Sequence, residues 1–306
     1  MLTACEASHS IGSYSDFQDG ITAEPRDLDQ SRYPDRVDET IPSYNTQLKK
    51  QITLRSIDPN LPQRPSWSPS GSRFLKETAL LSIDDREQVV YREIRSGNFP
   101  AFLRQLVPVT VHGEILDQFG NYRTATAVIR VMPDYLAIGS NDDFVRIPMN
   151  YYTATSLAKA FDLLLPTDRI VDAINDQAAV RASPTPLPSG PDMISNSYIA
   201  KHHRLIQRQL GLYPLGALVS GIKKDIVLAE KLVTHPNRIA IYGWHGPNGR
   251  PIQPLSDIHN AAYADYSHGV RLMSPFVEIN GKLKRIEELL ADWQTAPLFA
   301  SEGRIH

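Results

Sequence analysis

The sequence is almost free of cysteine, because its 306 residues contain only Cys5. A single cysteine cannot close an intramolecular disulfide and cannot supply the thiolate ligands of a structural zinc site. Cys5 also lies in a stretch whose composition is typical of disorder. We therefore expect no disulfide and no cysteine nucleophile.

Long apolar runs and an excess of one charge are missing too. No window approaches the ~18 consecutive apolar residues of a transmembrane helix, and the N-terminus lacks the basic start and apolar run of a signal peptide. Lys and Arg number 32 against 34 Asp and Glu, so no overall field attracts nucleic acid or an anionic membrane. We expect a soluble protein that binds neither, whereas its compartment and oligomeric state stay open.

Motifs with a fixed mechanism are absent as well. The chain has no GxSxG, HExxH, CxxC, GxxxxGK[ST] or GxGxxG pattern, which argues against nucleotide-dependent redox or phosphoryl-transfer chemistry. The composition is that of an ordinary globular protein, 42% hydrophobic and 22% charged. The length fits one large domain or two modest ones.

Composition divides the chain into an arm and two lobes. Residues 1–70 are rich in Ser, Asp, Pro, Gln and Arg, and their apolar residues are too scattered for a helical face or a strand. They predict an irregular N-terminal arm. Residues 183–192 are proline-rich and predict a rigid connector. We expect this connector to separate an α+β lobe at 71–182 from a second α+β lobe at 193–306.

Hydrophobic spacing predicts the elements of both lobes. The first should contain a helix over 83–96, a β-hairpin or meander over 107–131 closed by a short strand at 144–149, and two helices with Thr153 and Thr167 as N-caps. The second should contain a helix over 195–211, strands over 215–221, 223–233 and 237–245, and a helix over 283–294. Strict βαβ alternation is absent, which favours an α+β fold with a mixed, largely antiparallel sheet and packed helices.

Reactive side chains are concentrated between Gly221 and Arg271. This window contains four histidines, two adjacent lysines, three aspartates and three tyrosines, whereas residues 113–201 contain no histidine. We expect catalytic roles for His245, His268, Asp265, Lys223 and Ser267. We expect substrate binding by Tyr242, Trp244, Tyr263, Tyr266 and Arg271.

The strand predicted at 237–245 ends in Tyr242, Trp244 and His245, just before a Gly/Pro/Asn turn. A strand end is a rigid support for a site residue. Regular alternation would place side chains 242 and 244 opposite 243 and 245. The alternative is structural: the two aromatic rings complete the core and His245 caps a loop.

The stretch YADYSHGVR places Asp265, Ser267 and His268 beside a glycine. Asp265 can hold a histidine in one tautomer, and Arg271 can hold a carboxylate or phosphate oxygen. The alternative is a polar turn in which Asp265 caps backbone amides and Arg271 neutralises it. Lys223 starts a strand, and burial in a cleft would lower its pKa and suit it to base or electrostatic work.

A metal centre is a further alternative. His245, His259, His268 and Asp265 supply enough ligands, but their spacing matches no known zinc motif. The adjacent His202 and His203 lie on a predicted helix and are interpreted as structural. We therefore expect no metal and no other cofactor.

Several sequence blocks are distributed through residues 75–306: DYLAIGSNDDFVRIPM, LPTDRIVDAI, GIKKDIVL, IAIYGWH, PIQPLS and YADYSHGVRL. They resemble the blocks of a family of uncharacterised bacterial and fungal proteins, which implies one functional unit but no reaction. The stretch SHGVRL is similar to the SHGCxR[LM] signature of L,D-transpeptidases. It lacks their cysteine nucleophile, so their activity is not carried over.

Two classes of function fit these residues. The first is a cofactor-free hydrolase or transferase acting on a peptide-like or sugar-like substrate, with Ser267 or an activated water as nucleophile. Cyclisation or isomerisation of a small metabolite by the same groups is a neighbouring reaction. The second class is a module that binds carbohydrate or peptide on a platform of Tyr242, Trp244, Tyr263 and Tyr266. The clustered titratable groups favour the enzyme.

Overall fold

The computed structural model describes Pro59 and residues 61–306, and these described residues belong to one compact unit. Most of the arm predicted for residues 1–70, with Cys5, lies outside the described residues. Residues 61–70 contain turns and irregular backbone but no helix or strand. None of the described helices is long and apolar enough to cross a membrane.

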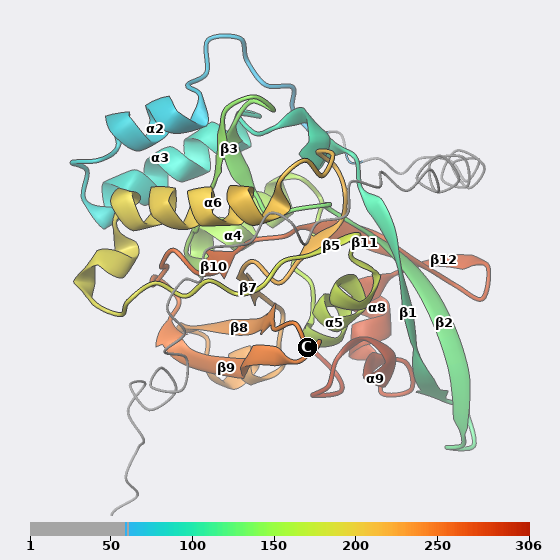
Figure 1. Ribbon diagram of the computed structural model, residues 1–306. Helices are drawn as coiled ribbons and strands as arrows, with labels where there is room; N and C mark the ends of the chain where they lie inside the picture. The colour runs from blue at the N-terminus through green and yellow to red at the C-terminus, as the bar shows by residue number, and fades with distance from the viewer. Residues whose placement is uncertain (1–58, 60) are drawn as a thin grey trace, which may run out of the picture. The chain divides into compact units, whose positions relative to one another are not determined.

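Four strands form an antiparallel sheet in the order β1-β2-β11-β12 (Figure 1). These strands are β1 (Val107–Leu116), β2 (Tyr122–Val131), β11 (Met273–Ile279) and β12 (Lys282–Arg285). β1 and β2 are the predicted hairpin, and Ala125, Ala127, Ile129 and Val131 alternate along the buried face of β2. Because β11 pairs with β2, this sheet contains strands from both sides of the proline-rich segment 183–192.

The strand predicted at 144–149 does not close this sheet. It is β4 (Phe144–Arg146), and it pairs with β3 (Ala137–Gly139) in a separate two-stranded sheet. The prediction was wrong because β11, which comes much later in the sequence, occupies the second edge of β2. Local spacing does not reveal such a distant partner.

A second four-stranded sheet, in the order β10-β7-β8-β9, carries most of the predicted site. Its strands are β7 (Lys224–Ile226), β8 (Arg238–His245), β9 (Pro251–Asn260) and β10 (His268–Gly269). β7, β8 and β9 are antiparallel, whereas β10 is parallel to β7. A short parallel pair joins β5 (Val180–Arg181) to β6 (Val219–Ser220). The fold is therefore α+β with largely antiparallel strands, as the sequence predicts.

The helices predicted from the hydrophobic spacing are present with shifted ends, and three further short helices, at 71–77, 231–234 and 296–299, were not predicted. They are α2 (Gly71–Glu77), α3 (Ile83–Arg95), α4 (Tyr151–Ala160), α5 (Asp168–Gln177), α6 (Asn196–Leu210), α7 (Lys231–Thr234), α8 (Ile286–Ala291) and α9 (Ala296–Phe299). Short 3-10 helices are η3 (Ala101–Arg104) and η4 (Pro191–Ile194). Thr167 occupies the N-cap position of α5 as predicted, without a side-chain capping hydrogen bond, and the Ser82 hydroxyl caps α3 by accepting the Asp85 amide. Thr153 is not an N-cap, because Asn150 precedes α4 and its side-chain oxygen accepts the Thr153 amide.

Two predicted elements of the second lobe are shorter than expected. The strand predicted over 223–233 ends at Ile226, and the chain then enters α7. The helix predicted over 283–294 begins only at Ile286, because Asn280 and Gly281 adopt positive φ angles of 51° and 70° and turn the chain back. Lys282–Arg285 then pair with β11 instead of forming a helical turn.

The two four-stranded sheets pack against helices through separate apolar clusters. Figure 1 shows α5, α8 and α9 beside the first sheet, and their apolar side chains belong to the same cluster as those of β1, β2 and β11. A larger cluster joins side chains of α3, α4 and α6 to β7 and β8, including the fully buried Ile226 and Ile241. β7, β8 and β10 therefore form a packed support whose polar groups are mostly buried, whereas the residues of β9 are partly or fully exposed.

Candidate functional site

Ionisable side chains are buried where β7, β8 and β10 meet. Six of them are at most 3% exposed: Lys223, Lys224, Asp225, Asp265, His268 and Arg271. Charged residues are almost never fully buried unless they are paired, since desolvation of a charge is expensive. Their concentration at one place is typical of a functional site, although structural networks of charges share this property.

His268 lies at the centre of this group. It starts β10, where it is the direct partner of Lys224 on β7, and the Lys224 amide donates to the Ser267 carbonyl at 2.8 Å. The His268 side chain is fully buried, and neither ring nitrogen has a hydrogen-bond partner among the described residues. Burial lowers the pKa of His268 to about 4, although the Asp265 charge opposes this shift. The imidazole is therefore neutral at pH 7.

Asp265 is a buried carboxylate held by its neighbours. Its Oδ1 accepts the Ser267 amide at 2.7 Å and the Ser267 hydroxyl at 2.6 Å, and its Oδ2 accepts the Tyr263 hydroxyl at 3.0 Å. Burial raises the pKa of Asp265, but the His268 charge and the Ser267 hydrogen bonds outweigh burial and bring it to about 2. Asp265 thus caps a backbone amide, as the structural alternative expected, and is also the charge partner of His268.

Both lysines at the start of β7 are buried, although neighbouring strand residues should face opposite ways. Lys223 Nζ donates to the Tyr266 carbonyl, and burial, reinforced by the Arg146 charge, lowers the Lys223 pKa to about 7. Lys224 Nζ lies 5.4 Å from the centroid of the Trp244 ring. Two amines are therefore placed in the protein interior near His268.

His259 and Tyr263 are the partly exposed members of this group. Their rings stack with centroids 4.8 Å apart, and they lie 5.9 Å and 5.7 Å from the His268 ring. Both come from the end of β9 and the loop that follows it. These two rings therefore extend the group from the buried His268 to partly exposed side chains.

His202 of α6 lies in the same interior region. Its ring is fully buried, without a hydrogen-bond partner in the described part of the chain, and contacts the rings of Trp244 and Tyr266. Burial lowers the pKa of His202 to about 2. The Tyr266 hydroxyl is occupied, because it accepts the Leu187 amide at 2.6 Å and donates to the Leu187 carbonyl. Through Leu187, these hydrogen bonds attach the proline-rich segment 183–192 to the chain just before β10.

His245 belongs to a different group, built around Asp172 of α5. His245 Nε2 and the Tyr242 hydroxyl each lie 2.8 Å from the same Asp172 oxygen. The expectation that side chains 242 and 245 lie on opposite faces was wrong, because Gly243 and Trp244 adopt positive φ angles of 100° and 52°. This interrupts the alternation of β8 and brings both side chains to one carboxylate.

Trp244 therefore has an uncommon backbone conformation for a bulky side chain. A non-glycine residue at positive φ costs free energy, and such residues cluster at functional sites. Its ring is 5% exposed and its Nε1 has no hydrogen-bond partner within the described residues. Trp244 is thus part of the interior group and not of an open aromatic surface.

Arg271 is held by backbone groups. Its guanidinium donates to the carbonyls of Met132 and Val219, both at 2.7 Å, and lies 4.5 Å from the Tyr135 ring centroid. The Tyr135 hydroxyl donates to Asp225 at 2.7 Å, and burial raises the pKa of Asp225 to about 6. These contacts assign Arg271 to the support of the sheet, with Tyr135 as its aromatic neighbour.

The structure thus brings four predicted catalytic residues together and separates the fifth. Asp265, Ser267, His268 and Lys223 lie around β10 and the start of β7, whereas His245 lies on Asp172. Reasoning from sequence missed Asp172, Tyr135 and the burial of His202. Asp172 lies on an amphipathic helix 73 residues before His245, where a partly exposed aspartate gives no signal of its partner.

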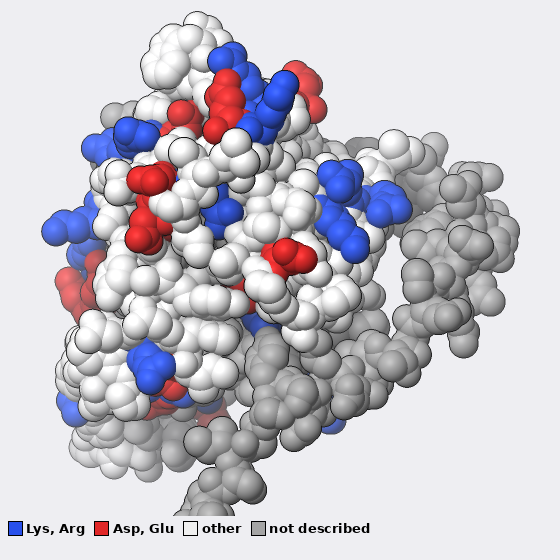
Figure 2. All heavy atoms as spheres, turned by 90° about the vertical axis from the view of Figure 1, so that its left-hand side faces the viewer, with Lys and Arg blue, Asp and Glu red and all other residues white. Residues whose placement is uncertain are grey.

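No group of three or more His, Cys, Asp or Glu side chains in the described range is placed to hold a metal ion. The alternative ligand set is divided, since His245 bonds Asp172 while His259, His268 and Asp265 lie around Tyr263. On the face shown in Figure 2, acidic and basic side chains of the described residues are interspersed.

Comparison with known proteins finds no matching family model, no similar curated protein and no similar solved structure. The function is therefore argued from the buried group itself. We call Lys223, Lys224, Asp265 and His268 the interior site.

Proposed function

We propose that this protein is a cofactor-free acid–base enzyme, with hydrolysis or acyl transfer on a peptide-like or sugar-like substrate as its reaction class. The observation that carries the proposal is His268, a neutral imidazole in the interior whose two nitrogens make no hydrogen bond to the described protein groups. Buried polar groups are normally satisfied by the protein. A proton-transfer group, in contrast, must keep a nitrogen for the substrate or for water.

His268 would act as the general base. It accepts a proton from an attacking water, and the adjacent Asp265 carboxylate stabilises the imidazolium that forms. The Ser267 hydroxyl already donates to Asp265 at 2.6 Å, so its hydrogen bond points away from any base. This geometry favours an activated water over Ser267 as the nucleophile.

Lys223 would stabilise negative charge that develops on the substrate oxygen. One of its donors is used by the Tyr266 carbonyl, and an ammonium has three. In a buried site such a charge acts more strongly than in water. The proposed roles are therefore His268 as base, Asp265 as its charge partner and Lys223 as the oxyanion group.

The buried position of the aromatic rings favours an enzyme over a binding module with an aromatic platform. Trp244 and Tyr266 are 5% and 2% exposed, and Tyr242 lies with His245 on Asp172. These rings do not offer one open surface for stacking. Cyclisation or isomerisation remains a neighbouring reaction, because it needs the same proton transfer.

The proposal is tested by turnover of a panel of chromogenic esters, peptide amides and glycosides. We expect the unmodified protein to turn over at least one class, and His268→Asn to reduce the rate by about 10²–10⁴-fold. His235→Asn is the matched control, since His235 is an exposed histidine paired with Asp257, and it should leave the rate unchanged. A His268→Asn variant with the same rate as the unmodified protein would contradict the proposal, and so would the absence of turnover for every substrate class.

A solvent isotope experiment separates the two reaction types. Hydrolysis in water labelled with oxygen-18 places one labelled oxygen in the product. Isomerisation or cyclisation without water attack leaves the product unlabelled. An unlabelled product would exclude water as the nucleophile and leave acyl transfer to another acceptor, isomerisation or cyclisation.

A further inference from the structure

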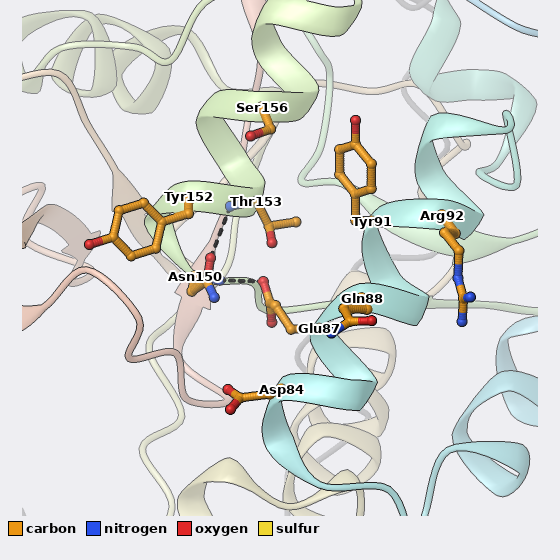
Figure 3. A pocket seen from close by; sticks show the side chains of 9 residues that line it. All are labelled: Asp84, Glu87, Gln88, Tyr91, Arg92, Asn150, Tyr152, Thr153 and Ser156. Atoms are coloured by element: carbon orange, nitrogen blue, oxygen red, sulfur yellow. Dashed lines mark hydrogen bonds between the residues drawn. The ribbon is translucent and has the colours of Figure 1, made fainter.

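A hollow of about 480 Å³ lies between α3 and α4 (Figure 3). This volume falls in the range of small-molecule sites. Nine side chains line it: Asp84, Glu87, Gln88, Tyr91, Arg92, Asn150, Tyr152, Thr153 and Ser156. Every one of them carries a hydrogen-bonding group. None belongs to the interior site, so ligand binding in the hollow does not depend on the proposed enzymatic function.

The side of the hollow formed by Glu87 is fixed by hydrogen bonds. Glu87 Oε1 accepts the Asn150 amide at 2.8 Å, and the Asn150 side chain accepts the Thr153 amide at 2.9 Å (Figure 3). Glu87 is buried, and burial raises its pKa, although the bonds from Asn150 and Thr153 oppose the shift. A carboxylate on one helix is thus attached to the first turn of the other.

Two tyrosines flank this polar wall. In Figure 3, Tyr152 projects from α4 and Tyr91 from α3, with Thr153 and Ser156 between them in this view. Tyr152 is 49% exposed, so its ring is accessible from solvent. A tyrosine offers an apolar face together with a polar tip, which suits a ligand that has C–H faces and hydroxyl edges.

The side chains that line the hollow indicate which class of ligand it would bind. The hollow has no Val, Leu, Ile or Met side chain in its wall, so the apolar part of its surface comes from the tyrosine rings and the carbon stems of its polar side chains. Two carboxylates, Asp84 and Glu87, oppose the single cation Arg92, so the wall disfavours an anionic ligand. Amides, hydroxyls and carboxylates together supply the donors and acceptors that a polyhydroxylated molecule needs. We propose that this hollow is a binding site for a neutral carbohydrate.

The experiment is an NMR titration of the full chain with defined probes. The neutral sugars are maltotetraose, cellotetraose and N,N′-diacetylchitobiose; tetragalacturonate is the anionic probe and spermidine the cationic one. We expect at least one neutral sugar to shift the amide signals of Gln88, Asn150 and Thr153 saturably, and tetragalacturonate not to do so. No response to the neutral sugars, or a response to spermidine or tetragalacturonate alone, would overturn the proposal.

Two tyrosine variants locate the binding. Tyr152→Ala removes an exposed ring from the wall and should weaken the affinity for the sugar about 5-fold or more. Tyr213→Ala is the matched control, because Tyr213 is 58% exposed and lies outside the hollow. Equal affinity of the Tyr152→Ala variant and the unmodified protein, or equal weakening by both variants, would overturn the site. His268→Asn should bind the sugar normally, which separates this test from that of the enzyme.

Discussion

Lys224 and His268 are direct partners in the parallel pairing of β7 with β10. This register places a lysine backbone beside a fully buried imidazole, and the neighbouring Lys223 is buried as well. The charges act on His268 in opposite directions, because Asp265 raises its pKa whereas Lys224 and Lys223 lower it. The interior site is therefore a set of coupled charges whose members can be changed one at a time.

Lys223→Met should stabilise the protein near neutral pH. The pKa of Lys223 is lowered from 10.5 to about 7, so the unfolded chain takes up a proton as pH falls through this range and the folded chain does not. The free energy of unfolding therefore decreases as pH falls from 10.5 to 7. Below pH 7 the full decrease, about 5 kcal/mol, is present. The net gain of the variant is smaller, since the Tyr266 carbonyl loses its donor.

Urea unfolding at pH 6.5 and pH 10 measures this effect. The difference between Lys223→Met and the unmodified protein should be larger at pH 6.5 than at pH 10. Lys284→Met, at an exposed position on β12, is the control and should change little at either pH. A Lys223→Met variant that is less stable than the unmodified protein at pH 6.5 would contradict this assignment.

His202→Leu should reduce the acid sensitivity of the fold. The pKa of the buried His202 is lowered from 6.5 to about 2, so its contribution is constant above pH 6.5 and stability is lost as pH falls below that value. Leucine cannot take up a proton in either state. We expect the free energy of unfolding to fall less between pH 7.5 and pH 5 for His202→Leu. His112→Leu, at an exposed position on β1, should keep the original pH dependence.

Asp172→Asn should weaken the attachment of α5 to β8. One Asp172 oxygen binds both Tyr242 and His245, and charged acceptors make stronger hydrogen bonds than neutral ones. Because Asp172 is partly exposed, we expect a loss of about 1 kcal/mol in the free energy of unfolding. Asp176→Asn changes an exposed aspartate one turn later on α5, and its stability should stay within about 0.5 kcal/mol. Equal effects of the two substitutions would argue against the shared hydrogen bond.

The rate of the proposed enzyme should depend on pH in a bell-shaped manner. The base form of His268 is present above its pKa of about 4, and the charged form of Lys223 is present below its pKa of about 7. We expect kcat/KM to rise through the first value and fall through the second, measured on the substrate class that the panel identifies. In Lys223→Met the fall near pH 7 should disappear while the rise remains.

The local pattern of the sequence predicted the elements better than their partners. The hydrophobic spacing over 83–96 and the alternation in β2 are short-range signals, and the helix and the hairpin that they predict are present. The pairing of β2 with β11 was missed, because it depends on packing between distant segments. The C-terminal helix was placed too early, because the spacing of LKRI fits a strand as well as a helix.

The candidate site shows the same limit of prediction from sequence: contacts between neighbouring residues are predicted, and contacts between distant segments are missed. Asp265, Ser267 and His268 are close in sequence, and their contacts follow from one tight turn. His245 was assigned to the same group, but two positive φ angles in β8 direct it to Asp172. A prediction from sequence periodicity assumes a regular strand. It fails at Trp244, because the backbone there has a positive φ angle.

The central claim is that His268 is a neutral, electrostatically coupled imidazole in the interior of the protein, and NMR titration of its ring tests this most directly. The account predicts a pKa near 4 in the unmodified protein, a lower value in Asp265→Asn and a higher value in Lys223→Met. His235, exposed on the surface, serves as the internal reference in the same spectra. A His268 pKa near 6.5 that responds to neither substitution would contradict the account.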